Sequence, residues 1–499
     1  VFTNGGKMTR KDIFVSVATT ETRIAVLEND LLIEFHVDRP DQVSLVGNIY
    51  KARVLNLMSG LKAAFVDIGL EKNGFLPLDE IPFKEFSELF ENEDIEINEE
   101  FKTEGMKLRE NQEIIVQVTK DSYGVKGPRV TSYISIPGRY VVLLINAKNV
   151  GVSRKIHNRH EREQLARTGK EIKPTGMGLI IRTAAATARS EEIQQEVQYL
   201  KSTWEKNLKL ATEPAPHLIY AEPSTLIKIV RDLFNQEVRN LYVDNEFKYR
   251  EIIQYLSNVS PRMRSRVKLY KDPEPLFFKY GIEEQLKTIF EKKIWLPSGG
   301  YIVIDQTEAF LAIDVNTGKS SKEKQAERLA LSTNIEAIKE IARQLRLRDI
   351  GGLVVVDLID LEKRENLERI VREFKSLIRS DRARYRIGEI SEFGLFQFTR
   401  ERSRTSLTYS LSEVCPVCKG RGRIISKMSV ISDIERWFFN NARSIKNKIV
   451  ELQVSPRIAD FLTTKGSDIL AKFSRDCNLI LKIKADFTMA EDDFKVSVL

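Results

Sequence analysis

Two aspartates stand at the ends of apolar runs, in Phe310-Leu311-Ala312-Ile313-Asp314 and in Leu353-Val354-Val355-Val356-Asp357. Each run has the character of a buried strand, which brings a carboxylate to the edge of a sheet. A buried carboxylate needs a positive partner, and two that converge suggest a divalent cation. Asn316 follows Asp314 and could help to hold a metal-bound water. The alternative is that each aspartate only caps the next helix or turn.

A second metal motif is the turn Cys415-Pro416-Val417-Cys418. It points two thiolates at one tetrahedral metal, usually zinc, which needs four ligands. The remaining cysteine, Cys477, lies in an ordinary-looking segment, and no histidine is near. The simplest completion is the same pair from a two-fold partner, which gives a shared four-thiolate site. A redox pair is the alternative, but it usually opens a helix in a thioredoxin-like unit, which this sequence does not predict.

Aromatic and basic residues indicate a nucleic-acid partner. Phe65 and Phe75 lie where rings could stack on unpaired bases, although a lone phenylalanine is more often part of a core. Lys120 and Lys126 follow on a predicted strand and loop, where they could reach phosphates. Between residues 126 and 189 there are thirteen Lys or Arg but only three acidic residues. This excess of positive charge favours binding to a polyanion over the alternative, a basic surface that is only solvated.

Arg182 and Thr183 end a predicted strand that begins at Gly178. A guanidinium fork beside a hydroxyl makes a good phosphate clamp, whereas an isolated arginine at a strand end more often forms a surface ion pair. The four histidines lie far from the carboxylate strands in sequence. Their absence there weighs against a two-histidine nuclease and favours water activated by a metal.

Composition limits the class of protein. With 499 residues, 42% hydrophobic and 30% charged, the chain should form several soluble globular domains. No apolar stretch is long enough to cross a bilayer, and the start has no secretory signal pattern. Three cysteines do not make a disulfide framework, so we expect a reducing cytoplasm.

The elements that position these residues follow from periodicity and turns. Strand-like runs in the first forty residues precede short strands and glycine turns between Gly47 and Lys120, with a closing strand at Glu113–Lys120. This pattern predicts a five-stranded barrel of the oligonucleotide-binding type. The acidic segment 85–104 interrupts it as a surface insertion. Further elements are expected as strands at Val141–Leu144 and Gly178–Ile181, and as helices at Ser190–Leu208 and Ser224–Leu241, with a linker at 213–216. From Ile294 the order is strand, strand, helix, strand, helix, and the long helix covers 322–347.

Together these residues resemble the ribonuclease E/G family. The segments that carry the resemblance span nearly the whole chain: Val46–Pro77, Gly178–Ala184, Ser298–Gly300, Asp314–Asn316, Ile341–Asp349, Asp357–Asp360, Gly394-Leu395 and the Cys415 motif. The opening Val17–Arg23 and the chain length are closer to the ribonuclease G branch, so we expect no long scaffold tail of the ribonuclease E kind.

The resemblance implies roles for particular residues. Asp314 and Asp357 would bind catalytic Mg²⁺, and Asn316 would orient water or phosphate. Attack by water on a phosphodiester would leave 5′-phosphate and 3′-hydroxyl ends. Single-stranded RNA would be clamped by Phe65, Phe75, Lys120 and Lys126, and a 5′-monophosphate would be held by Arg182, Thr183, Gly138, Val142 and Arg384. Cys415 and Cys418 would supply half of a structural Zn²⁺ link in a homodimer, which could pair into a tetramer.

The family architecture is a ribonuclease H-like fold with two insertions, followed by a catalytic α/β domain. On this chain it implies a ribonuclease H-like fold at 1–41 and 226–291, an S1 barrel at 42–138, a 5′-sensor region at 139–225, a DNase I-like catalytic domain at 292–411, a zinc link at 412–424 and a small C-terminal domain at 425–499. We therefore expect an endoribonuclease for ribosomal RNA 5′-end maturation and messenger RNA decay. The alternatives are a non-catalytic RNA-binding or ribosome-assembly factor and, less well supported, a DNA nuclease.

Overall fold

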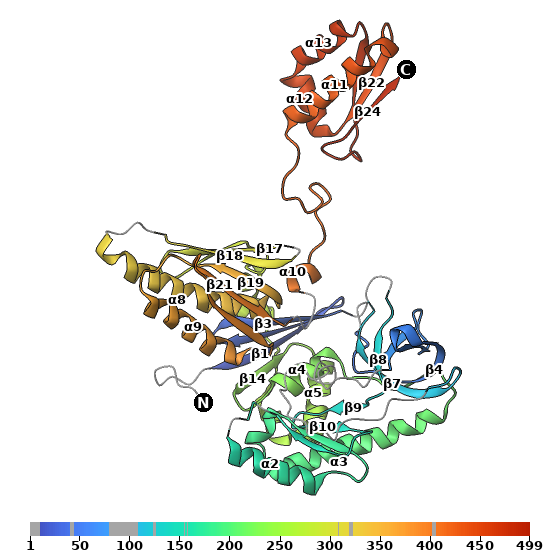
Figure 1. The fold of residues 1–499 in the computed structure, drawn as a ribbon, viewed down its shortest axis with the longest axis vertical. Helices are drawn as coiled ribbons and strands as arrows, with labels where there is room; N and C mark the ends of the chain where they lie inside the picture. Colours follow the sequence, from blue (N-terminus) through green and yellow to red (C-terminus); the bar gives the residue numbers. More distant parts are fainter. Residues whose placement is uncertain are drawn as a thin grey trace. The chain divides into compact units, whose positions relative to one another are not determined.

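The computed structural model describes residues 10–39, 44–78, 108–122, 126–153, 155–156, 158–307, 309–318, 323–401 and 406–499. The acidic segment 85–104, predicted as a surface insertion, lies outside these residues. The chain forms two compact units, Val1–Ser410 and Leu411–Leu499. Both contain helices and strands (Figure 1), so the mixed α/β class predicted from the sequence is confirmed.

A five-stranded sheet joins the first described residues to a much later part of the chain. Its order is β15-β14-β1-β2-β3, and β1 runs parallel to β14 and antiparallel to β2. Buried aliphatic residues of these strands pack with those of the helices α4 and α5. The elements are β1 (Lys11–Val17), β2 (Thr22–Glu28), β3 (Leu31–Asp38), α4 (Thr225–Leu233), β14 (Val238–Val243), α5 (Glu246–Val259), β15 (Val267–Leu269), α6 (Leu276–Lys279) and α7 (Ile282–Lys287).

The single helix predicted for Ser224–Leu241 is wrong. Helix α4 ends at Leu233, where Phe234 leaves the helical region at φ −80° and ψ 73°. Val238–Val243 is the strand β14, whose buried residues pair in parallel with β1. The apolar residues of this segment fit a helical stripe as well as a strand, and pairing with a distant strand decides between them.

A closed barrel of five strands follows, in the order β4-β5-β6-β8-β7, and a β4–β7 pairing closes it. This agrees with the predicted small barrel. Strand β7 has the predicted bounds. Strands β8 and β13 were not predicted, and β13 pairs antiparallel with β4. The strands are β4 (Ile49–Met58), β5 (Ala63–Asp67), β6 (Gly74–Pro77), β7 (Glu113–Lys120), β8 (Arg129–Thr131) and β13 (His217–Tyr220).

The basic segment folds as a four-stranded sheet with two helices, in the order β11-β12-β10-β9. Helix α2 begins after Asn158, whose side chain accepts hydrogen bonds from the amides of His160 and Glu161, as an N-cap does. The bounds are β9 (Ser135–Pro137), β10 (Val141–Leu144), β11 (Val150–Val152), α2 (Arg159–Ile172), β12 (Gly178–Ile181) and α3 (Ser190–Leu208). Strands β10 and β12 and helix α3 lie where the sequence predicts them.

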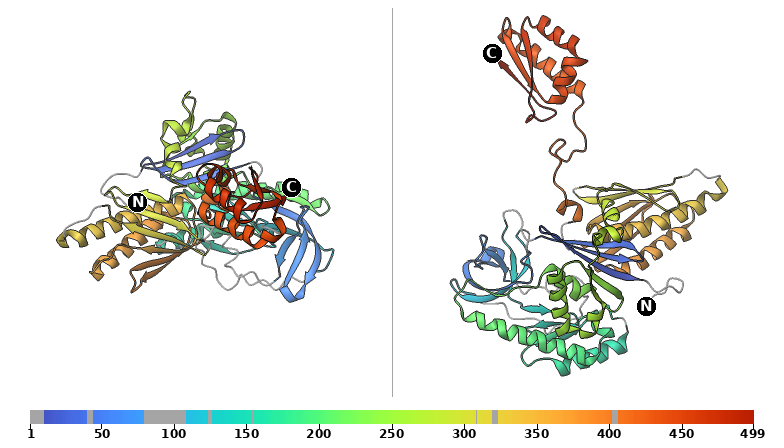
Figure 2. Two further views of the ribbon diagram at one scale, coloured as in Figure 1. Left: turned by 90° about the horizontal axis from the view of Figure 1, so that it is seen from above. Right: turned by 180° about the vertical axis from the view of Figure 1, so that it is seen from behind.

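The two aspartates belong to a six-stranded sheet in the order β16-β17-β18-β19-β21-β20. Helices α8 and α9 lie side by side along one face of it (Figure 1), and the views in Figure 2 agree. Strands β20 and β21 were not predicted. The elements are β16 (Lys293–Trp295), β17 (Tyr301–Gln306), β18 (Phe310–Asn316), α8 (Glu323–Leu347), β19 (Gly352–Asp357), α9 (Arg364–Leu377), β20 (Tyr385–Ile390), β21 (Leu395–Arg400) and α10 (Leu407–Ser410).

The second unit has its own core, formed by a three-stranded sheet and three helices. The sheet order is β23-β22-β24, with β22 parallel to β23 and antiparallel to β24. Its elements are α11 (Lys427–Ile445), β22 (Ile449–Val454), α12 (Pro456–Thr464), α13 (Ser467–Asp476), β23 (Ile480–Ala485) and β24 (Phe494–Val498). Among the described residues of the whole chain, no helix combines the length and apolar character that crossing a membrane requires.

Candidate functional site

Asp314 and Asp357 are direct neighbours on the six-stranded sheet. Strands β18 and β19 run parallel, and these two residues are partners in the register, so their Cα atoms are about 5 Å apart. The alternate residues Ile313 and Val356 are buried against the helices. Because successive side chains of a strand point to opposite faces, both carboxylates emerge on the open face, and both are exposed.

Asn316 completes this group. Its Nδ2 donates a hydrogen bond to Oδ2 of Asp314 at 2.7 Å, and it lies two residues along the same strand, on the same face. The backbone there is held by the turn before β17. A Cβ atom on Gly300 would come within 2.7 Å of the Asn316 carbonyl oxygen, so the turn can approach this closely only without a side chain.

The donor set suits a hard cation. Paired carboxylates with an amide beside them are the oxygen ligands that Mg²⁺ takes, with water in its other positions. Within the described ranges, no group of three or more His, Cys, Asp or Glu side chains is placed to hold a metal ion. The oxygen donors that the structure brings together at this place are the two aspartates, with the amide of Asn316 next to them.

Asn334 is a residue of the site that the sequence reasoning missed. It is fully buried on α8, where its Nδ2 donates to the carbonyl of Ile359 at 2.8 Å and its Oδ1 accepts from the amide of the same residue at 3.0 Å. Ile359 lies two residues after Asp357, so this amide clamps the segment that leaves the site. An asparagine in a helix amid apolar residues was the only available signal.

The barrel residues lie in one row on its surface. Phe65 pairs with Phe75, Phe75 pairs with Arg129, and Arg129 pairs with Lys120 across four neighbouring strands. The two phenylalanine rings are half-buried and meet edge to face, with centroids 5.8 Å apart. Lys120 and Lys126 are exposed. The structure thus brings three of the four predicted residues together and adds Arg129, which becomes a neighbour of Phe75 only through the pairing of β6 with β8.

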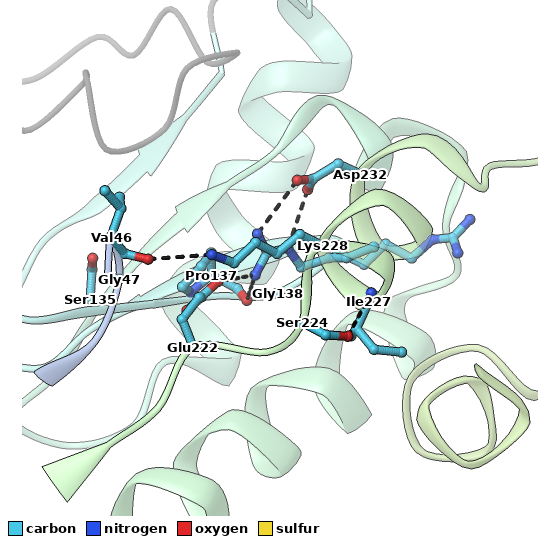
Figure 3. Close-up of polar contacts among 12 residues, drawn as sticks. Val46, Gly47, Ser135, Pro137, Gly138, Glu222, Ser224, Ile227, Lys228 and Asp232 are labelled. Carbon is cyan, nitrogen blue, oxygen red and sulfur yellow. Dashed lines mark hydrogen bonds and ion pairs between the residues drawn. The ribbon is translucent and has the colours of Figure 1, made fainter. Parts of the chain in front are cut away.

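Arg182 is buried rather than open. Its NH1 donates to the carbonyl of Gly138 at 2.5 Å and to Oδ1 of Asp232 at 2.7 Å. Figure 3 shows Gly138 and Asp232 with Pro137 and Glu222 nearby. The carbonyl of Pro137 and the carboxylate of Glu222 both accept hydrogen bonds from NH1 of Arg231. Burial favours the neutral form of the Asp232 carboxyl, but Arg231 and Arg182 outweigh it and hold the pKa of Asp232 well below its ordinary value.

The other predicted phosphate ligands lie in three different segments of the fold. Thr183 is exposed, and its hydroxyl lies 3.1 Å from that of Ser153. Val142 is buried next to Gly138 in the β9–β10 hairpin. Arg384 is exposed immediately before β20, and its Nε is 4.0 Å from Glu401. Arg382, two residues earlier, adds to the lowering of the Asp232 pKa, so the segment before β20 lies within electrostatic reach of Asp232.

The carboxylate of Glu196 lies beside this site. It is fully buried and accepts hydrogen bonds from three successive backbone amides, those of Arg139, Tyr140 and Val141, at 2.6, 2.6 and 3.1 Å. Its burial raises its pKa above the ordinary value in spite of these donors. Glu196 thus occupies the anion-binding end of the hairpin and fixes the carbonyl of Gly138 toward Arg182.

In the second unit, Cys415 and Cys418 lie on a tight turn with Cys415 exposed. The amide of Lys419 donates to the Cys415 carbonyl, and Lys419 and Gly420 both adopt positive φ. The backbone amides of Cys418 and Val417 face the Cys415 sulfur and lower the pKa of this thiol. Cys477 is buried, with its Sγ 3.7 Å from the carbonyl of Phe438. The turn therefore brings two thiols together, and the amides that face Cys415 favour its thiolate form.

Comparison with known proteins agrees with this geometry. The model of the ribonuclease E/G family matches residues 135–403. The chain is 33% identical to ribonuclease G of Haemophilus influenzae and 32% identical to ribonuclease G of Escherichia coli, over 98% of this chain and 99% of each relative. It is 35% identical to ribonuclease E of Haemophilus influenzae over 95% of this chain and 50% of that protein.

The chain therefore belongs to the ribonuclease E/G family. Both the family resemblance and the enzyme class, an endoribonuclease, that the sequence predicts are confirmed at this level. The individual metal, RNA and phosphate ligands stay predictions, as do the domain boundaries.

Proposed function

We propose that this chain is a magnesium-dependent endoribonuclease that cuts single-stranded RNA, senses a 5′-monophosphate, and leaves 5′-phosphate and 3′-hydroxyl ends. Its cellular roles would be ribosomal RNA 5′-end maturation and messenger RNA decay. The observation that carries the proposal is the register pairing of Asp314 with Asp357 on the open face of their sheet. Two exposed carboxylates side by side repel one another unless a cation lies between them.

Asp314 and Asp357 would hold Mg²⁺, and Asn316 would orient a water molecule or a phosphate oxygen through its amide. A bound Mg²⁺ supplies positive charge that stabilises the developing charge of the phosphodiester in the transition state. The role of the chain is positioning: Asn334 fixes the segment after Asp357, and the Gly300 turn fixes the backbone of Asn316.

The row of Phe65, Phe75, Arg129 and Lys120 on the barrel would bind the RNA strand. Half-buried rings give a stacking surface for bases of any sequence, and the cations beside them offer contacts to phosphates. Lys126 would extend this positive edge. Such a surface requires unpaired bases, which supports a preference for single strands.

Arg182, with Thr183, Gly138, Val142 and Arg384, would recognise the 5′-monophosphate. Hydrogen bonds to Gly138 and Asp232 hold the Arg182 guanidinium in place, and its planar fork matches the oxygens of a phosphate. The exposed hydroxyl of Thr183 adds a donor next to it. The low pKa of Asp232 keeps its charge, so a bound phosphate would compete with this carboxylate for the guanidinium.

The Cys415 and Cys418 pair would bind Zn²⁺ together with the same pair of a second copy, which makes the enzyme a homodimer. Two thiolates per chain are half of a tetrahedral site, and the lowered pKa of Cys415 favours the charged ligand form.

The test is cleavage of short oligonucleotides that carry either a 5′-monophosphate or a 5′-hydroxyl, with Mg²⁺ titrated. Asp314→Asn should reduce cleavage by at least about 100-fold, because it removes a charged metal ligand. Asp305→Asn is the matched control, since Asp305 is exposed on the same face but pairs with Lys292. Equal products from the wild type and Asp314→Asn would contradict the proposal, and binding without Mg²⁺-dependent products would favour a non-catalytic RNA-binding factor.

A further inference from the structure

The open face of the catalytic sheet carries a cluster of aromatic and basic residues that the proposed function does not use. Lys293 and Trp295 lie on β16 and Tyr301 on β17. The Nζ atom of Lys293 is 4.2 Å from the centroid of the Trp295 ring and 3.7 Å from that of Tyr301. The two rings meet edge to face at 5.3 Å. We call these three residues the aromatic cluster.

Trp295 is 64% exposed, although its neighbours in sequence, Ile294 and Leu296, are buried. The alternation of the strand therefore turns the indole away from the core and into solvent. An exposed indole ring offers a flat face on which an unpaired base can stack. Lys293 lies over its face and adds a positive charge where a nucleic acid would bring phosphates.

The sheet register places this cluster beside the acidic pair. Trp295 pairs with Tyr301, and Tyr301 pairs with Asn316. In the next row, Lys293 pairs with Val303, and Val303 pairs with Asp314. Strands are about 4.8 Å apart, so β16, which carries Trp295, lies two strand spacings, about 10 Å, from β18, which carries Asp314. A span of this size is on the scale of a nucleotide.

We propose that the aromatic cluster is a base-stacking subsite, in which Trp295 stacks on one unpaired base of the RNA next to the phosphodiester that is cut. Lys293 lies between the rings and contacts the adjoining phosphate. This inference rests on the proposed function, because it takes the acidic pair as the place of cleavage. A second copy of the chain covering the same face is the competing occupant. RNA is favoured because the ammonium group of Lys293 and the two rings match a phosphate that adjoins an unpaired base.

The subsite is tested by RNA binding in the Asp314→Asn background, so that its result does not depend on cleavage. Adding Trp295→Ala should weaken binding of an oligonucleotide by about tenfold, as the loss of one base stack does, whereas Trp295→Phe should restore most of it. The matched control is Phe247→Ala, which removes an aromatic ring that is 81% exposed on α5. It should leave binding unchanged.

An abasic scan identifies the base. Removing one base at each position in turn should weaken binding at a single position by about the same factor as Trp295→Ala, and the two changes together should cost no more than either alone. Fluorescence gives a second readout. The other two tryptophans are Trp204, which is buried, and Trp437, which is half-buried in the second unit. RNA should therefore quench mainly the exposed Trp295, and Trp295→Phe should remove most of that quenching.

The subsite would be overturned if the effects of base removal and of Trp295→Ala on RNA binding were additive at every position. It would also be overturned if RNA quenched the fluorescence of Trp295→Phe as much as that of the parent chain. A change in sedimentation on Trp295→Ala with unchanged RNA binding would also overturn it and assign the face to a second copy. Failure of the proposed function looks different, because Asp314→Asn would then cleave RNA like the wild type.

Discussion

Replacing Asn334 by alanine should damage both stability and catalysis, because this side chain joins α8 to the segment after Asp357. The substitution removes two hydrogen bonds, to the carbonyl and the amide of Ile359, at 2.8 and 3.0 Å. A buried hydrogen bond contributes about 1 kcal/mol net, and a group left without a partner costs about 1–3 kcal/mol. The free energy of unfolding should therefore fall by about 2–3 kcal/mol.

The catalytic effect follows from the position of Asp357. With the exit segment loosened, the carboxylate no longer keeps its place beside Asp314, and a misplacement of about 1 Å can cost about 100-fold in rate. We expect kcat to fall by about 10- to 100-fold with little change in KM, and more Mg²⁺ to be needed for half-maximal rate. Asn334→Asp keeps an acceptor for the amide of Ile359 but turns a second carboxylate oxygen toward the Ile359 carbonyl in a fully buried position, so it should destabilise the chain at least as much as alanine.

The assay combines denaturant unfolding with cleavage of a labelled oligonucleotide at several Mg²⁺ concentrations. Asn258→Ala is the matched control, since Asn258 is exposed on another helix, α5, and should change neither measurement. If Asn334→Ala unfolded and cleaved like the wild type, the clamp would have no role in holding Asp357. A loss of stability with unchanged kcat would show that Asp357 keeps its place without it.

Three further outcomes are expected. Glu34→Gln should destabilise the chain at neutral pH. Desolvation raises the pKa of Glu34, but Arg382, His36 and Arg346 outweigh it and hold that pKa well below its ordinary value. The loss of stability should shrink as pH falls below about 4.5, and a loss independent of pH would contradict this. Arg182→Ala should slow cleavage of 5′-monophosphorylated RNA by about tenfold more than of 5′-hydroxyl RNA, and an equal loss on both would refute a phosphate sensor. Replacing both Cys415 and Cys418 by serine should lower zinc content and weaken self-association in sedimentation, whereas unchanged zinc and sedimentation would refute the shared site.

Local patterns predicted the elements whose apolar periodicity is unambiguous. Strands β7, β10 and β12 and helix α3 have their predicted bounds, and α8 begins within a residue of its prediction. The segment Thr225–Val243 was misread, because only its pairing with β1, far away in sequence, makes its second half a strand. Strands β20 and β21 were missed for a similar reason: they are short and partly exposed, and they form by pairing with β19 and with each other.

The candidate site shows the same division. The nearness of Asp314 and Asp357 could be predicted, because two apolar runs that end in a carboxylate imply neighbouring strand ends. Arg129 could not be predicted, since it reaches Phe75 only through the pairing of β6 with β8. The partner of Arg182 could not be predicted either, because Asp232 lies on α4, a helix that packs against a different sheet. Contacts that depend on the meeting of distant segments carry no local pattern.

Metal binding by the acidic pair is the claim on which the whole account depends, and Mn²⁺ binding followed by electron paramagnetic resonance tests it most directly. Mn²⁺ should bind tightly to the wild-type chain and support RNA cleavage over the same range of concentrations. The double variant Asp314→Asn with Asp357→Asn should lose both Mn²⁺ binding and cleavage. Mn²⁺ bound equally well by the double variant, or cleavage retained by it, would contradict the assignment of these two aspartates.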